Sequence, residues 1–318
     1  MVSFIKLKIA VFVCSNGLGH LRRQSKIINL LLDKNIKVDL YANLESVKKY
    51  DRNLVKITTN LNLKDKIFNY NLSYNLDILS NINFKQYDLI LSDNLVELTF
   101  FHNKVFLFSS FYWSRQLELN ENDNNTFSNL EKKIKIHYST GFFTPKYISS
   151  QKSFVDVGFF GTKNPINKNF HKKNVLVSCG NDVNDTKSYI ENNLDDMCNK
   201  LCDYQIYTDV TKNNKTRNLH DFRYKESDFK KIDIAIIRPG MGIITELLSR
   251  EIPIVVLSVE NTPEMLFNKD QLVAMGCIAI SKIDELNNDL LDSHNPYIEN
   301  INFNAENFIT EKIIRDFF

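Results

Sequence analysis

The stretch IDIAIIRPGMGIITELLSREIPIVVLS, residues 232–258, carries the pattern strand, glycine-containing turn, helix, strand. Both ends are short runs rich in isoleucine and valine, which favour buried strands, and the middle has apolar residues at helical spacing. A strand, a helix and a second strand in this order are typical of a unit built around a parallel sheet. The stretch therefore predicts an α/β fold.

The same alternation extends along the whole chain. Strands are predicted at residues 8–15, 37–42, 88–93, 104–110, within 137–150, and at 174–182, 204–210, 232–240 and 252–260. Helices are predicted after the first strand and at residues 126–136, 185–201 and 305–318. Because the pattern restarts after a stretch of little periodicity, two similar α/β domains are expected.

The predicted organisation has four parts. Residues 1–155 form an N-terminal Rossmann-like domain and residues 174–302 a C-terminal one, with a linker at 156–173. Residues 303–318 form a final helix, which we expect to pack back on the N-terminal domain. A chain of 318 residues is long enough for two domains that each bury a core.

Composition and charge argue against several classes of protein. The formal charge is only +2 and the lysines are scattered, which disfavours a nucleic-acid partner. We find no secretory signal and no run of about 18 apolar residues. The five cysteines lack metal-site spacing and the histidines are not paired. We expect a cytoplasmic protein without a metal site or cofactor, with peripheral contact to the inner face of a membrane left open.

The glycine turn after residue 237 has the features of an anion site. Gly240 and Gly242 allow a tight turn and close approach of a ligand, and the following helix points unpaired N–H groups at the turn. A diphosphate suits this position, and Glu246 could accept hydrogen bonds from a ribose. A structural glycine turn is an equally good interpretation of these residues alone.

The next loop and helix, VENTPEMLFNKDQLVAMG at residues 259–276, place Glu264 and Asn268 one helical turn apart. They follow the neighbouring strand, so they belong to the same edge of the sheet, where open α/β sheets bind ligands.

These two segments resemble the donor-binding region of GT-B glycosyltransferases related to the lipid-linked N-acetylglucosamine transferase of peptidoglycan synthesis. The resemblance implies an α/β fold of two Rossmann-like domains whose parallel sheets face each other across a cleft. Arg238, Gly240, Glu246 and Asn268 match the family pattern, in which the glutamate binds ribose and the asparagine faces the donor. Glu264 stands where the family has a glutamine, which leaves the donor sugar undefined. The implied donor-binding set also includes Met241, Gly242 and Ile243, together with Gly17 and Gly19 near the start of the chain.

Two further segments fit this resemblance. Gly180 and Asn181 follow the first strand of the second domain, where such enzymes bring backbone groups to the phosphates. Phe222 and Arg223 lie where the family's loop borders the nucleobase.

The first half offers a catalytic candidate in CSNGLGHLRRQ, residues 14–24. Gly17 and Gly19 form a turn without the full dinucleotide fingerprint, and the string resembles the N-terminal turn of GT-B transferases and of the sugar-nucleotide hydrolase of pseudaminic acid synthesis. His20 is the expected general base, kept neutral by the helix dipole, and Asp93 is expected to orient it. Capping or packing roles are the alternative for both. Arg22 and Arg23 are expected to face solvent or steer phosphates.

The aromatic run Phe111, Tyr112 and Trp113 follows a predicted strand. It has two interpretations, an acceptor platform or core aromatics at a domain edge, and we favour the core.

These features together predict a metal-independent hexosyltransferase that moves a sugar from a nucleoside diphosphate sugar, with UDP the expected carrier, to a glycan, lipid or protein acceptor. A sugar-nucleotide hydrolase of the pseudaminic-acid type shares the same motifs, and a degenerate non-catalytic GT-B partner subunit is a third interpretation. Sugar-nucleotide 2-epimerases share the fold but need further carboxylates, for which no clear set is present.

Overall fold

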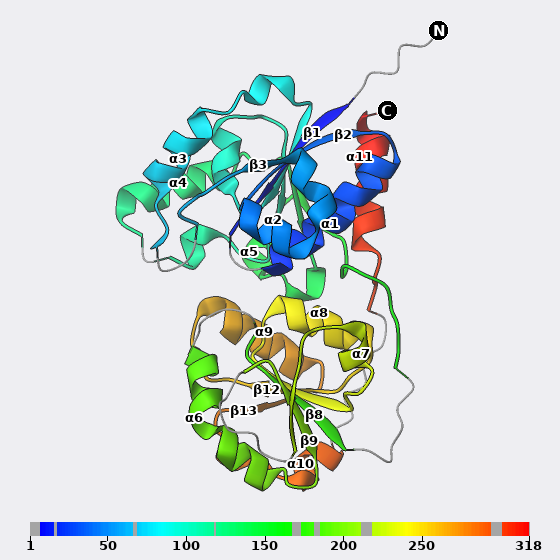
Figure 1. The fold of residues 1–318 in the computed structure, drawn as a ribbon. Coiled ribbons are helices and arrows are strands. Elements are labelled where there is room, and N and C mark those ends of the chain that lie inside the picture. The colour runs from blue at the N-terminus through cyan, green and yellow to red at the C-terminus, as the bar shows by residue number, and fades with distance from the viewer. Residues whose placement is uncertain are drawn as a thin grey trace. The chain divides into compact units, whose positions relative to one another are not determined.

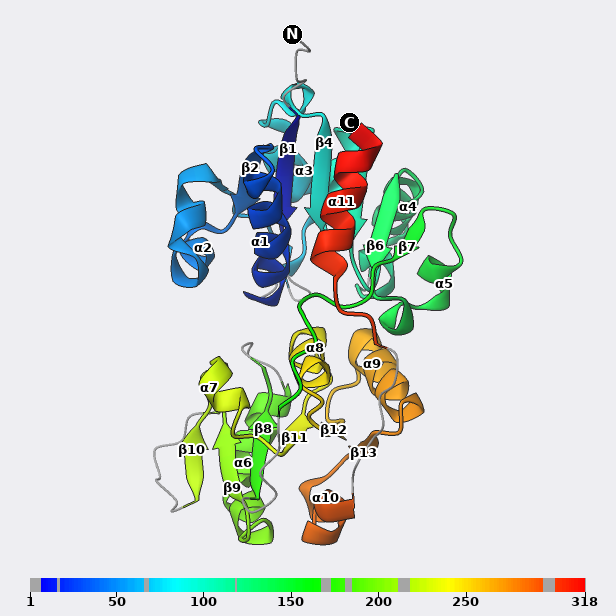
Figure 2. The same ribbon diagram turned by 90° about the vertical axis from the view of Figure 1, so that its right-hand side faces the viewer.

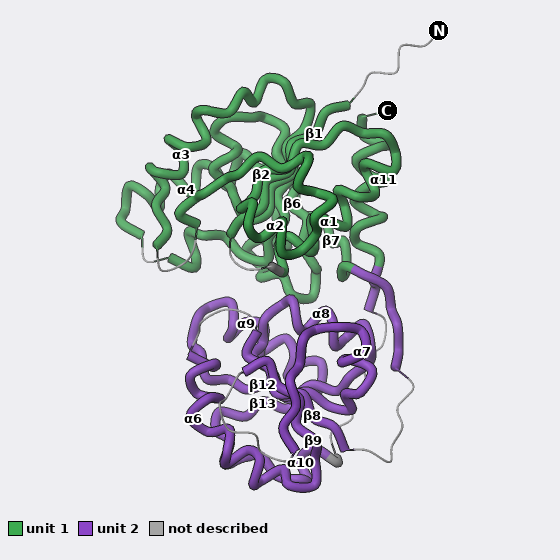
Figure 3. The backbone as a smooth tube through the Cα atoms, viewed as in Figure 1, with its two compact units in different colours: residues 1–160, 304–318 green, residues 161–303 purple. Residues whose placement is uncertain are grey.

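A computed structural model describes residues 7–15, 18–65, 69–117, 119–166, 173–180, 185–210, 218–293 and 301–317. The chain divides into two compact units (Figure 3). Unit 1 comprises Met1–Phe160 and Asn304–Phe318, and unit 2 comprises Gly161–Phe303. Each unit contains one parallel β-sheet with helices packed on it, so the predicted α/β class is confirmed.

Unit 1 has a seven-stranded sheet in the order β3-β2-β1-β4-β5-β6-β7, with every neighbouring pair parallel. Figure 2 shows β2, β1 and β4 side by side. The order changes direction between β1 and β4, the position at which open α/β sheets bind ligands. Its main elements are β1 (Lys8–Val13), α1 (Leu18–Asp33), β2 (Lys37–Ala42), α2 (Leu44–Tyr50), β3 (Thr58–Asn60), α3 (Leu72–Ser80), β4 (Leu89–Asp93), β5 (Val105–Phe108), α4 (Glu121–Glu131), β6 (Ile136–Ser139), α5 (Lys146–Ser149), β7 (Phe154–Asp156) and α11 (Ala305–Phe317).

Alternating residues of the central strands of unit 1 enter two separate cores. Ile9 and Val11 of β1 pack with Ile28 of α1 and Ile309 of α11, whereas Phe12 belongs to the core on the opposite face. This alternation follows from the two-residue period of a strand. The last helix, α11, therefore lies beside α1 and completes a core built around the first strand (Figure 1).

Unit 2 repeats this topology with a six-stranded sheet in the order β10-β9-β8-β11-β12-β13. Its order changes direction between β8 and β11, and all its strand pairs are parallel. Val175, Val177 and Ile236 of the sheet pack against Ile190 and Leu194 of α6. Its elements are β8 (Asn174–Ser178), α6 (Asp185–Lys200), β9 (Gln205–Thr208), β10 (Leu219–Asp221), α7 (Glu226–Phe229), β11 (Ile234–Ile237), α8 (Met241–Ser249), β12 (Ile254–Leu257), α9 (Pro263–Ala274), β13 (Ile278–Ile280) and α10 (Asn288–Ser293).

One predicted helix is displaced in the structure. The expected helix at 126–136 is α4, which begins at Glu121 because Asn120 caps it, accepting a hydrogen bond of 2.9 Å from the N–H of Asp123. It ends at Glu131, and Ile136 already starts β6. In the part of the chain that the structure describes, no helix is both long and apolar enough to cross a bilayer.

Candidate active site

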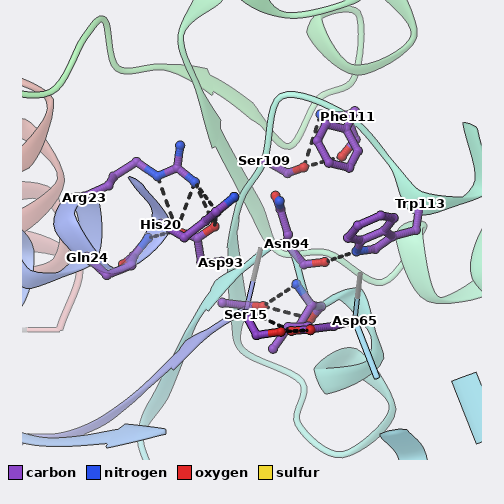
Figure 4. Close-up of polar contacts among 12 residues, drawn as sticks. Ser15, His20, Arg23, Gln24, Asp65, Asp93, Asn94, Ser109, Phe111 and Trp113 are labelled. Atoms are coloured by element: carbon purple, nitrogen blue, oxygen red, sulfur yellow. Dashed lines mark hydrogen bonds and ion pairs between the residues drawn. The ribbon is translucent and has the colours of Figure 1, made fainter. Parts of the chain in front are cut away.

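The switch point of the unit 1 sheet brings a histidine and an aspartate together. His20 lies in the first turn of α1, and Asp93 is the last residue of β4. Nδ1 of His20 lies 2.6 Å from Oδ1 of Asp93 (Figure 4). The Asp93 side chain is fully buried and that of His20 is 20% exposed. When Nδ1 carries the proton shared with Asp93, Nε2 is left as the basic nitrogen.

Helix α1 supplies two further partners for Asp93. The guanidinium of Arg23 donates to Oδ1 at 2.8 Å and to Oδ2 at 3.0 Å, and the amide of Gln24 donates to Oδ2 at 3.0 Å. His20, Arg23 and Gln24 are spaced three and four residues apart, so they share one face of the helix. The expectation that Arg23 faces solvent is wrong, because its guanidinium is paired with this buried carboxylate, whereas its expected role in steering phosphates stays a prediction.

The charges at this centre shift both pKa values. Burial raises the pKa of Asp93, but Arg23 and His20 outweigh it and bring the value to about 2. Burial lowers the pKa of His20, but its interactions with Cys14 and Asp93 outweigh burial and hold that pKa well above its ordinary value. The expected lowering of the His20 pKa by the helix dipole is therefore wrong. His20 is a stronger base than free imidazole, and its neutral share grows as the pH rises.

Cys14 is a neighbour that the sequence analysis did not single out. It follows β1 directly, is buried, and has its sulfur within 4.8 Å of ligand atoms of His20 and Asp93. Burial raises the pKa of the Cys14 thiol. Its position at the end of the strand next to β4 was the available signal, because adjacent parallel strands end at one edge.

Backbone contacts hold the loops around this centre. Asp65 accepts hydrogen bonds from the N–H of Ser15, at 2.7 Å, and from its hydroxyl. Asn94 has a φ of 63°, and its carbonyl accepts a hydrogen bond of 2.8 Å from Nε1 of Trp113 (Figure 4). Trp113 is only 1% exposed, so it is a core residue that braces the β4 loop.

The remaining residues that the sequence singled out in unit 1 are two aromatic residues and two glycines. Phe111 and Tyr112 are buried like Trp113, which favours the core interpretation of all three. Gly19 is exposed at the start of α1, whereas Gly17 lies outside the described residues.

The predicted glycine turn of unit 2 lies at the switch point of its sheet. It follows β11, and Gly240 is the N-cap of α8 without a side-chain cap, so the first N–H groups of the helix are not satisfied by a capping side chain. Among the residues that the structure describes, no atom outside the chain neighbours and helix backbone of Gly242 lies within 4 Å of where its Cβ would be. Met241 is half-buried and Ile243 is buried beneath the turn. The turn thus presents backbone N–H groups on an open surface.

Arg238, just before this turn, is held by a carboxylate that the sequence analysis missed. Its Nε and one terminal nitrogen each lie 2.8 Å from an oxygen of Glu260. The hydroxyl of Thr186, at the start of α6, donates to the same carboxylate at 3.0 Å. Burial raises the pKa of Glu260, but the hydrogen bonds and charge of Arg238 outweigh burial and lower it.

Helix α9 contacts the glycine turn through the side chain of Asn268. Asn268 is fully buried and donates a hydrogen bond of 2.9 Å to the carbonyl of Pro239, inside the turn. Glu264, one helical turn earlier, is half-buried. The structure therefore places Asn268 as a support for the turn backbone.

Glu246 lies on α8 with its carboxylate already oriented. Its Oε2 accepts a hydrogen bond of 2.6 Å from Arg250, whose side chain is 10% exposed. Arg250 is held in turn by Glu226 at 2.7 Å and by the ring of Phe229. Neither Arg250 nor Glu226 was predicted, since their pairing depends on the packing of α7 against α8.

The loop after β8 is bound to another carboxylate. Gly180 has a φ of 80°, a conformation that favours glycine, and its N–H lies 3.1 Å from Oδ2 of Asp209. Asp209 also accepts a hydrogen bond of 2.6 Å from Ser178 and one from the hydroxyl of Tyr224. A phosphate at Gly180 would have to compete with Asp209 for that N–H group. Asn181 lies outside the described residues.

The two residues expected to border a nucleobase are placed differently from each other. Phe222 is buried and packs edge-on against Phe229. Arg223 is exposed, and its backbone N–H donates to Asp228 at 3.1 Å. Arg223 is therefore the member of the pair that a ligand can reach.

Comparison with known proteins shows the fold. No protein-family model and no curated protein sequence matches the chain. Among solved structures, CalG4, the calicheamicin glycosyltransferase, has a TM-score of 0.64 at 10% identity, covering 98% of this chain and 94% of that one. MurG of Acinetobacter baumannii has a TM-score of 0.61 at 12% identity, covering 97% and 99%. The UDP-GlcNAc 2-epimerase of Neisseria meningitidis has a TM-score of 0.60 at 13% identity, covering 97% and 99%. The predicted GT-B fold of two Rossmann-like domains, and its likeness to glycosyltransferases, are confirmed.

Proposed function

We propose that this chain is a metal-independent glycosyltransferase that takes a sugar from a nucleoside diphosphate sugar, with UDP as the carrier, and uses His20 as its general base. The observation that supports this most is the 2.6 Å contact between His20 and the buried Asp93 at the switch point of unit 1. A carboxylate on Nδ1 fixes the tautomer and leaves Nε2 to accept a proton.

The donor diphosphate is assigned to the turn of Gly240, Met241, Gly242 and Ile243. Backbone N–H groups at the start of α8 would bind the phosphate oxygens, and the helix dipole would stabilise the charge of the leaving diphosphate. Arg238 lies beside the turn, with a terminal nitrogen 3.5 Å from where a Cβ of Gly240 would be, and its bidentate pairing with Glu260 keeps the guanidinium at a fixed position. These groups stand in for the charge that a metal ion supplies in other transferases.

The rest of the donor is assigned to neighbouring residues of unit 2. Glu246 would accept hydrogen bonds from the ribose hydroxyls, supported by the Arg250 contact that holds its carboxylate. Glu264 would contact the sugar hydroxyls, and Arg223 would border the nucleobase. Asn268 would act by supporting the turn through Pro239.

The proposed reaction requires a base and groups that stabilise the leaving diphosphate. The acceptor hydroxyl oxygen forms a bond to the anomeric carbon while the bond from that carbon to the diphosphate oxygen breaks. The hydroxyl proton goes to Nε2 of His20, and Asp93 stabilises the imidazolium that results. The diphosphate leaves with the bonding electrons, stabilised by the α8 N–H groups and Arg238.

A hydrolase is the second candidate, because the contact that activates a hydroxyl activates water equally well. The glycine–histidine turn followed by arginine is shared with such hydrolases, and Arg23 is part of the Asp93 cluster. The two candidates differ only in which oxygen attacks the anomeric carbon.

The test is a calorimetric screen of the chain against UDP, GDP, dTDP, CMP and their common sugars, with and without EDTA. Binding of one nucleoside diphosphate that is unchanged by EDTA supports the donor site. Product analysis with the bound sugar nucleotide then separates transfer from hydrolysis, since water gives the free sugar. The absence of binding by every member of the panel would contradict the proposal and favour a non-catalytic partner subunit.

A further inference from the structure

The Cys14 thiol has no role in the proposed transfer, although it lies in the same cluster. Among the residues that the structure describes, Cys14, His20 and Asp93 are the group whose sulfur, nitrogen and oxygen atoms all lie within 4.8 Å of one another. Cys14 is 3% exposed and Asp93 is fully buried, so both atoms are held by the surrounding core.

The chemistry of these three atoms selects a particular kind of cation. Zinc is bound by thiolate, imidazole and carboxylate ligands at about 2.0–2.3 Å, so ligand atoms in its tetrahedral sites lie about 3–4 Å apart. Magnesium and calcium prefer all-oxygen ligands, so a cysteine and a histidine disfavour them. The cluster has one ligand of each kind that zinc accepts, already within reach of a small side-chain adjustment.

We infer that Cys14, His20 and Asp93 form a binding site for Zn²⁺ and related thiophilic divalent cations, and that metal binding there inhibits the enzyme. Cys14 would bind as the thiolate and release its proton to solvent. The His20 nitrogen that binds the metal loses its free lone pair or its link to Asp93, so the base is disabled. The inhibitory consequence rests on the proposed function, whereas the metal site does not.

Arg23 is the group that opposes the metal. Its guanidinium already neutralises both oxygens of Asp93, at 2.8 and 3.0 Å. A metal ion on Asp93 would bring a second cation beside the guanidinium, so Arg23 must move as the metal binds. The Arg23 side chain is 23% exposed, which gives it a path toward solvent. Arg23 therefore sets the metal concentration at which the site fills.

The His20 side of the cluster is where a metal ion would enter. The His20 side chain is 20% exposed while that of Asp93 is completely buried. Three protein ligands with one accessible side leave a fourth position for water, as in zinc sites that are not purely structural.

The test uses Co²⁺ as a spectroscopic probe and Zn²⁺ as its competitor. The wild-type chain should show a thiolate-to-cobalt charge-transfer band that Zn²⁺ removes. Cys14→Ser and His20→Ala should each lose the band, and the exposed Cys202→Ser serves as the matched control that keeps it. Arg23→Gln should bind Zn²⁺ at least about tenfold more tightly. Absence of the band in the wild-type chain, its persistence in Cys14→Ser, or unchanged affinity in Arg23→Gln would overturn the proposal.

Separate controls distinguish loss of metal binding from unfolding and from loss of activity. His20→Ala keeps Cys14 in place, so its result stands even where Cys14→Ser unfolds, and thermal melting identifies such unfolding. In the activity arm, release of the nucleoside diphosphate from the donor should be inhibited by Zn²⁺, restored by EDTA, and resistant to Zn²⁺ in Cys14→Ser. Cobalt binding without any donor turnover would leave the metal site standing and remove the proposed function. Turnover insensitive to Zn²⁺ would remove the inhibitory role.

Discussion

The two switch points of this molecule have the same topology and opposite chemistry. In unit 1 the buried Asp93 binds side chains, one of which is a histidine whose pKa is held well above its ordinary value by Cys14 and Asp93. In unit 2 Asp209 and Glu260 bind backbone N–H groups, hydroxyls and an arginine. None of those partners of unit 2 gains or loses a proton near neutral pH.

This difference assigns two kinds of work. A carboxylate that raises the pKa of a histidine builds a base, whereas a carboxylate that fixes an arginine and a glycine turn builds a rigid frame for an anion. Strand order alone does not distinguish them, because β1 and β4 are related in the same way as β8 and β11. The group that each carboxylate binds determines whether the switch point is suited to act as a base or to bind an anion.

The largest expected effect is on the unit 1 centre. His20→Ala should lower turnover by about 10²–10⁴-fold, the usual contribution of a general base. The measurement is release of the nucleoside diphosphate from the donor at saturating donor concentration. The exposed His220→Ala in unit 2 is the matched histidine control and should retain full activity. Equal turnover in His20→Ala and the wild-type chain would remove the base from the account.

A second histidine of unit 1, His137 of β6, shows what happens to the pKa of a buried imidazole without a carboxylate partner. His137 is fully buried, with Nε2 2.7 Å from the carbonyl of Ser109. Burial lowers its pKa to about 4, against a weaker opposing effect of that carbonyl. The unfolded chain therefore binds more protons than the folded chain between about pH 4 and pH 6.5, and stability falls as the pH falls through this window.

The shift corresponds to about 3 kcal/mol of stability lost between pH 7 and pH 4. Urea denaturation at several pH values measures it, with His137→Asn expected to reduce the slope and His220→Gln to leave it unchanged. His20 contributes in the opposite direction and in another window, because its raised pKa adds stability that is lost as the pH rises above 6.5. A slope that survives in His137→Asn would contradict the assignment.

The next prediction concerns the proposed diphosphate site of unit 2, where Arg238 lies beside the glycine turn. Arg238→Ala should weaken donor binding by about 10–100-fold, because it removes the cation beside the glycine turn. Arg238→Lys keeps the charge but loses the bidentate pairing with Glu260, so an intermediate affinity is expected. Calorimetry with the donor found in the nucleotide screen measures both variants. Wild-type affinity in Arg238→Ala would show that backbone groups alone bind the diphosphate.

The smallest effect compares two glycines of unit 2. Gly180→Ala should destabilise the fold by about 1–2 kcal/mol, because its φ is 80°. Gly242→Ala, in the first turn of α8 with open space around it, should stabilise the fold by about 0.5–1 kcal/mol and weaken donor binding. Thermal melting of the two variants checks both signs. Destabilisation by Gly242→Ala would mean that this glycine serves the fold and not a ligand.

Hydrophobic patterns and short motifs in the sequence predicted most of the strands and helices. They also predicted some of the residues at each candidate site, but not the partners that hold those residues. Buried strands such as β1 and β11 consist of consecutive apolar residues, which a sequence pattern can identify. The strands β3, β10 and β13 contain three residues each, too few to give a recognisable hydrophobic pattern. The contact of His20 with Asp93 was predictable because both lie at ends of strands or helices on one sheet edge.

The missing parts of the sites depend on contacts between distant elements. Glu260 and Asp209 are unremarkable acidic residues in the sequence, and only packing brings them to Arg238 and Gly180. The predicted direction of the His20 pKa shift was wrong for the same reason, since a local argument from the helix dipole omits the interactions with Cys14, which follows β1, and with Asp93 of β4.

The most direct measurement is a calorimetric titration of one nucleoside diphosphate sugar into the wild-type chain, His20→Ala and Glu246→Ala, with melting curves to confirm that each variant is folded. The two-centre account predicts that His20→Ala binds the donor within about twofold of the wild-type affinity, while Glu246→Ala binds at least about tenfold more weakly. Equal affinity in all three chains, or loss of donor binding in His20→Ala, would contradict the division of work between the two switch points.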